Sequence, residues 1–169
     1  MLYMLGFLCG IFYANFIAKN YITVTGIFHE YFLNQYIQAE IVEEEYLWYL
    51  FRWRAAPFAG LVLAGYTGLK KPAAVLCLLW TGFSAGVLAV AAVLRLGARG
   101  MLLCLAGLFP QIFFYIMGYA VLLWYFYRYP QAEWNRGKTA FVAVMMAAGL
   151  LVEAYVNPAV VRGVMKLVM

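Results

Sequence analysis

Charged and catalytic side chains are scarce in this sequence. Of its 169 residues 11% are charged, and it contains no aspartate, one histidine and three cysteines. The lack of aspartate removes most two-carboxylate and metal schemes, and no HExxH, P-loop or GxGxxG motif is present. His29 has no Cys or His partner at ligand spacing, and Cys9, Cys77 and Cys104 form no CxxC pair. The sequence therefore predicts neither an enzyme nor a metal or cofactor site, and the cysteines are expected to be small buried hydrophobes.

What the chain has in abundance is apolar sequence. Hydrophobic residues make up 67% of it and the mean hydropathy is +0.85, whereas soluble domains are roughly half apolar and a quarter charged. The twelve Lys and Arg residues occur in ones and twos beside the apolar runs, which is typical of membrane loops and excludes a nucleic-acid-binding face. We expect an all-α, polytopic membrane helix bundle in one domain, 1–169, with the lipid bilayer as its surroundings.

The apolar runs predict about five transmembrane helices. Their expected spans are 2–18, 55–69, 73–94, 100–127 and 139–157. The span at 55–69 is the shortest. Lys and Arg are absent before Lys19, so the first helix is expected to remain as an uncleaved anchor. Pro110 is expected to kink the fourth span, and Pro158 to end the fifth.

Residues 19–54 differ from the rest because they hold five of the seven glutamates. Apolar residues recur at helical spacing on both sides of Glu43-Glu44-Glu45, which reads as a surface turn. We expect two short amphipathic helices that form a cap at the membrane surface between the first and second spans. Trp48 and Trp53 suit the interfacial aromatic belt.

Two glycine pairs stand at the spacing that allows close helix contact. Gly6 and Gly10 share one helix face, as do Gly82 and Gly86, and such pairs let a neighbouring backbone approach. We favour packing within the chain's own bundle over a dimer interface.

Three polar side chains fall inside apolar spans: Asn15, Gln111 and Glu153. In a five-span arrangement all three lie in one half of the bilayer, so they are expected to form a polar cluster. A structural clamp between helices is the favoured interpretation, and a ligand or proton site is the alternative. An ionised Glu153 without a partner would cost several kcal/mol. The arginines expected on that side of the membrane are Arg52, Arg54, Arg95 and Arg99, and we predict that one of them, or backbone N–H groups, bonds the carboxylate.

Read in order, several segments resemble the stage II sporulation protein M family of Firmicutes. The Gly-rich first helix ending at Asn15 is similar to that family's opening helix, and Leu79–Leu88 resembles its Lys-Gly-x-x-x-Gly helix, with Thr81 in place of Lys. Leu108-Phe-Pro-Gln111 and Val152-Glu-Ala-Tyr-Val-Asn-Pro158 resemble its Pro-Gln and Glu-Ala-Tyr-x-x-Pro segments, and the tail from Val160 fits its closing segment.

The resemblance implies five spans with the N-terminus in the cytoplasm, although the positive-inside count slightly opposes this, with five basic residues inside and seven outside. It also implies a non-enzymatic scaffold in the cell membrane, at the mother-cell membrane that engulfs the forespore. Its partners would be two cell-wall hydrolases, the stage II sporulation proteins P and D. The alternative function is a permease-like subunit of a transporter, with Asn15, Gln111 and Glu153 lining a pathway.

Overall fold

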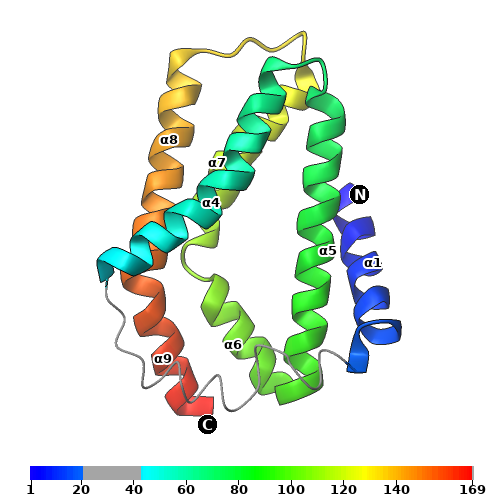
Figure 1. Cartoon of the computed structure of the whole chain (residues 1–169), viewed down its shortest axis with the longest axis vertical. Helices are drawn as coiled ribbons and strands as arrows, with labels where there is room; N and C mark the ends of the chain where they lie inside the picture. The colour runs from blue at the N-terminus through cyan, green and yellow to red at the C-terminus, as the bar shows by residue number, and fades with distance from the viewer. Residues whose placement is uncertain (21–42, 169) are drawn as a thin grey trace. The chain divides into compact units, whose positions relative to one another are not determined.

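A computed structural model describes residues 1–20 and 43–168, and every regular element within them is a helix (Figure 1). The elements are α1 (Leu2–Phe16), α4 (Glu43–Tyr66), α5 (Lys70–Leu96), α6 (Ala98–Leu108), α7 (Ile112–Arg128), α8 (Arg136–Leu151), the π-helix η1 (Val152–Val156) and α9 (Asn157–Val168). The predicted all-α class is therefore confirmed for the described part of the chain. The first half of the predicted cap, with His29, lies outside the described residues.

Membrane-length helices are fewer than the five spans predicted. Within the described residues α5 and the continuous helix Arg136–Leu167 are long and apolar enough to cross a bilayer, and the broken pair α6 and α7 gives a third if it counts as one span. Helix α1 is apolar but has only 15 residues. Large apolar side chains such as Leu76, Trp80 and Met117 are exposed, as expected of surfaces that face hydrocarbon.

The predicted boundary between the cap and the second span does not exist. Helix α4 runs without interruption through residues assigned to both, and Glu43–Glu45 lie within the helix instead of forming a turn between two helices. Pro57 lies inside the helix.

The prediction that Pro158 ends the last span is also wrong. The helix passes from α8 through η1 into α9, and Asn157 donates its N–H to the carbonyl of Val152, five residues earlier. A proline ring inside an α-helix collides with the carbonyl four residues before it. The wider π-turn lies just before Pro158 and relieves that collision, so the helix continues to Val168.

Pro110 interrupts its helix as expected. Helix α6 ends at Leu108 and α7 begins at Ile112. The N–H groups of Phe114 and Tyr115 donate to the Gln111 carbonyl, so a new helix starts there.

The chain divides into two compact units. The first contains residues 1–40, 75–107 and 160–169, and the second contains 41–74 and 108–159. In the first unit, α1 and α5 lie side by side (Figure 1). A Cβ on Gly6 or Gly10 would overlap the carbonyl of Leu79 or Phe83, and a Cβ on Gly82 or Gly86 would overlap that of Tyr3 or Phe7. The glycine pairs therefore pack within the chain, as predicted. Gly6 meets Leu79 and Gly10 meets Phe83, so residue numbers increase in the same direction along both helices and the helices run parallel.

The core of the first unit is built from small and aliphatic side chains of four helices. Ala14, Ala92, Leu103 and Met165 are among its buried members. The α5–α6 turn is closed by Gly97, whose φ of 58° suits glycine. The prediction of buried cysteines is wrong for Cys9, which is exposed on α1, while Cys77 and Cys104 are partly buried; all three are free thiols.

The second unit is centred on α7 and α8, which pack closely against each other. Phe126 of α7 is fully buried, with Leu122 and Ala74 in the same core. The ammonium group of Lys70 lies 3.5 Å from the centre of the Tyr129 ring, a cation–π contact that accommodates a buried charge. Helix α4 contacts η1 and α8 in this unit.

Candidate functional site

Glu153 lies in η1, the one stretch of the described chain that is wound as a π-helix. The residue is 6% exposed. A π-turn inserts an extra residue into the helical repeat and shifts the direction of the side chains around it, and such turns are frequent at functional sites. The winding here places a carboxylate inside the second unit.

Arg54 of α4 is the partner of this carboxylate. Its Nε donates to Oε2 at 3.0 Å and its Nη2 donates to Oε1 at 2.5 Å, which is the bidentate geometry that makes Arg–carboxylate pairs strong. The Glu153 side chain is 8% exposed and that of Arg54 is 46% exposed. The guanidinium therefore reaches from the surface of the unit to a buried acid.

Tyr115 of α7 completes the group. Its hydroxyl donates to Oε2 of Glu153 at 2.6 Å, and the guanidinium carbon of Arg54 lies 5.2 Å from the ring centre. Gly149 of α8 makes room for this ring, because a Cβ at Gly149 would lie 2.8 Å from the ring carbon Cε1. Four elements, α4, α7, α8 and η1, thus meet around one carboxylate.

The chemistry available to this group is limited. Both carboxylate oxygens accept hydrogen bonds, and the guanidinium carries a permanent charge that offsets that of the acid. A general acid or base must be able to reach a substrate proton, and these contacts hold both oxygens of Glu153 on the protein itself. The arrangement is suited to joining helices.

Of the four arginines predicted as partners, Arg54 makes the contact. Arg52 is exposed, while Arg95 and Arg99 belong to the first unit. The sequence predicts an Arg at this acid but leaves the choice open, because helical spacing places Arg52 and Arg54 on different faces without saying which face meets Glu153.

The predicted cluster of three polar residues is divided between the units. Asn15 is in the first unit, where its amide donates to the carbonyl of Ile11 at 3.0 Å. Gln111 is in the second unit and is 2% exposed; it stands at the N-cap position of α7, one turn before Tyr115, and its side chain makes no capping hydrogen bond. Tyr115, rather than Asn15, stands next to Glu153. The available signal was its spacing of four from Gln111, which places both on one face of α7.

The sequence also contains one motif of hydrolase type, in α5. Gly82-Phe-Ser84-Ala-Gly86 has the letter pattern G-x-S-x-G, which in hydrolases forms a sharp turn between a strand and a helix. Here the segment lies in the middle of α5, and both glycines face the backbone of α1. Its geometry is that of a helix seam, not of a nucleophile elbow.

No group of three or more His, Cys, Asp or Glu side chains suitable for a metal occurs among the residues that the structure describes. Comparison of the chain with protein-family models, curated proteins and solved structures gave no match.

Proposed function

We propose that this protein is a non-enzymatic membrane scaffold for the peptidoglycan hydrolases of engulfment during endospore formation. The resemblance of its segments, in order, to the stage II sporulation protein M family supports this proposal. The observation that carries the proposal is that Glu153 is buried and bonded to other side chains of the protein. A residue of the most specific matching segment is buried and bonded to Arg54 and Tyr115. The acid joins helices of the second unit, which supports a structural role for it.

A permease-like subunit is the competing function. It would require Glu153 to face a water-filled pathway, since a transported ligand or proton must reach it. The contacts of both carboxylate oxygens and the burial of the residue favour the scaffold.

The candidate surface for partner proteins, within the described residues, is the part of α4 that precedes Arg54. Trp48 and Trp53 are exposed there, at 70% and 65%. Exposed aromatic residues are common both at interfaces between proteins and in the headgroup region, and we propose that this stretch contacts the hydrolases outside the bilayer.

Co-purification tests the proposal. A tagged chain from sporulating cells, extracted in mild detergent, is expected to bring with it the stage II sporulation proteins P and D. The double substitution Trp48→Ser and Trp53→Ser should reduce both hydrolases in the eluate, whereas the control Trp80→Ser, at an exposed position of α5, should not.

Two results would overturn the scaffold proposal. One is the absence of both hydrolases from an eluate in which the bundle retains its thermal stability. The other is a deletion strain that completes engulfment normally, which would turn attention to transport.

A further inference from the structure

The two units differ in the charges they carry. The described part of the first unit, 1–20, 75–107 and 160–168, has five basic side chains and no Asp or Glu, whereas the second unit has seven basic and five acidic side chains. The five basic residues of the first unit are Lys19, Arg95, Arg99, Arg162 and Lys166. Its two glutamates, Glu30 and Glu40, lie outside the described residues.

The basic residues of the first unit gather at one end of it. Because α1 and α5 run parallel, Lys19 after α1 and Arg95 in the last turn of α5 are at the same end, and Arg99 opens α6 just beyond the turn. The two basic residues of α9 follow Val161 and Met165 in sequence, and both of these pack in the same core as Ala18 and Leu96.

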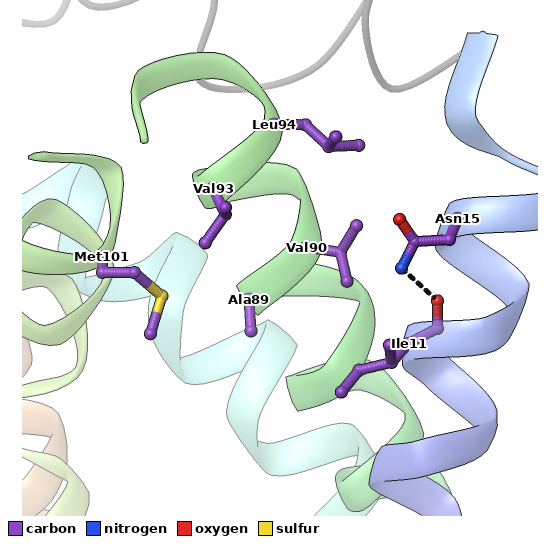
Figure 2. Close-up of a pocket in the computed structure, with 7 residues that line it drawn as sticks. All are labelled: Ile11, Asn15, Ala89, Val90, Val93, Leu94 and Met101. Carbon is purple, nitrogen blue, oxygen red and sulfur yellow. Dashed lines mark hydrogen bonds between the residues drawn. The ribbon is translucent and has the colours of Figure 1, made fainter. Parts of the chain in front are cut away.

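An apolar cavity of about 240 Å³, open to the surroundings of the protein, lies along the helices at this end (Figure 2). Its lining comes from α1, α5 and α6: Ile11, Asn15, Ala89, Val90, Val93, Leu94 and Met101. Figure 2 shows Asn15 and Leu94 toward one end of the cavity and Ile11 and Ala89 toward the other. The amide of Asn15 is the one polar side chain of the lining.

Arg95 belongs to the charged end of α5 and does not itself line the cavity. It directly follows Leu94, which lines the cavity, and its Nε is buried with no hydrogen-bond partner among the described residues. A buried donor without an acceptor is costly, so an external acceptor at this position would be favoured.

We propose that this end of the first unit binds an anionic phospholipid. One acyl chain would occupy the cavity, and the headgroup phosphate would lie among the basic side chains with Arg95 as its nearest donor. The charge excess calls for an anion, and the apolar lining calls for a hydrocarbon chain attached to it; a phospholipid supplies both. Clusters of basic residues at membrane surfaces attract anionic lipids by about 1 kcal/mol for each Lys or Arg.

Native mass spectrometry of the full chain in mild detergent tests the proposal. With equal amounts of phosphatidylglycerol and phosphatidylcholine, the wild type should retain phosphatidylglycerol preferentially. The double substitution Lys19→Gln and Arg95→Gln should lower that retention about fivefold for each charge removed. The matched control Lys71→Gln and Arg136→Gln removes two exposed charges of the second unit and should leave retention unchanged.

A second pair of variants tests the cavity. Val93→Trp fills it, whereas Leu76→Trp enlarges an exposed side chain of the same helix that does not line it. Val93→Trp should displace phosphatidylglycerol, and Leu76→Trp should not. If Val93→Trp has no effect while the charge variant does, the site binds a bare phosphate group and the proposal fails.

Other outcomes also overturn it. If the wild type shows no preference between the two lipids, there is no anionic lipid site. If the control pair loses as much phosphatidylglycerol as the charge variant does, the binding is general charge attraction and not a site. If the preference emerges only after Glu30→Gln and Glu40→Gln, the chain's own carboxylates occupy the basic end. Each outcome is independent of the co-purification result, so this inference and the scaffold proposal fail separately.

Discussion

Two contacts, one in each unit, hold helices together by different means. In the first unit α1 meets α5 along four glycines, so backbone lies directly on backbone. In the second unit α4 and α7 are joined to η1 through the long side chains of Arg54, Tyr115 and Glu153. Apolar burial drives helix association weakly in a bilayer, where close packing and polar bonds take its place. The first contact depends on glycines that lack a Cβ atom, and the second depends on the hydrogen-bond donors of Arg54 and Tyr115.

The largest loss of folding free energy is expected at the glycine contact between α1 and α5, where there is no space for a Cβ atom. Gly82→Ala with Gly86→Ala places two methyl groups against the carbonyls of Tyr3 and Phe7. Backbone cannot move aside as a side chain can, so we expect each change to cost about 1–3 kcal/mol of folding free energy. Thermal unfolding in detergent measures the loss.

Glycines with open surroundings supply the control for that experiment. A Cβ at Gly60 or Gly163 meets nothing within 4 Å, so Gly60→Ala and Gly163→Ala should be neutral or stabilising by up to about 1 kcal/mol. If the seam variants unfold at the same temperature as these controls, the close approach of α1 and α5 does not exist in the folded protein.

Removing the acid of the second unit should have the next largest effect. Glu153→Leu leaves Arg54 and the hydroxyl of Tyr115 without their acceptor, and we expect a loss of about 1–3 kcal/mol. Glu153→Gln should lose less, because its amide oxygen still accepts one bond. The two unfolding temperatures in detergent decide the matter; a Leu variant as stable as the wild type would assign the acid a role other than that of a clamp.

Removing one donor from the same group should cost less still. Tyr115→Phe deletes the hydroxyl that bonds Oε2 and keeps the ring against Gly149, so we expect a loss of about 1 kcal/mol. Tyr127→Phe, at an exposed position of the same helix, is the control. In a double-mutant cycle Tyr115→Phe and Glu153→Gln should be non-additive; additive losses would show that the hydroxyl and the carboxylate do not interact.

The smallest effect is expected at Asn15. Its amide bonds the carbonyl of Ile11 in its own helix, so Asn15→Ala should change the folding free energy by less than about 0.5 kcal/mol. Unfolding in detergent, in parallel with Glu153→Leu, gives the comparison. A loss at Asn15 as large as that at Glu153 would argue for the polar clamp that the sequence predicts across all three residues.

Features that follow from residue type at fixed spacing could be predicted from the sequence. The helical class, the break at Pro110 and the glycine contacts follow in this way, because periodicity and glycine pairs act locally. An arginine next to Glu153 could be predicted because the cost of a lone buried charge is large.

Features that depend on tertiary packing could not be predicted. A polar triplet such as Glu43–Glu45 separates helices in some chains and lies within a helix in others, and here it lies within α4, which packs against η1 and α8. The π-turn before Pro158 has no sequence signature of its own. The sequence therefore predicts that Pro158 ends the helix, as proline usually does, although the helix continues. The contact of Tyr115 with Glu153 could not be predicted, because a tyrosine in an apolar helix gives no sign of which group its hydroxyl bonds.

The parallel pairing of α1 and α5 constrains how the chain is threaded. Two neighbouring parallel helices joined by one chain require the connecting residues, 17–69, to travel back from the end of the first to the start of the second. If both helices lie across a bilayer, the connection must traverse it an odd number of times.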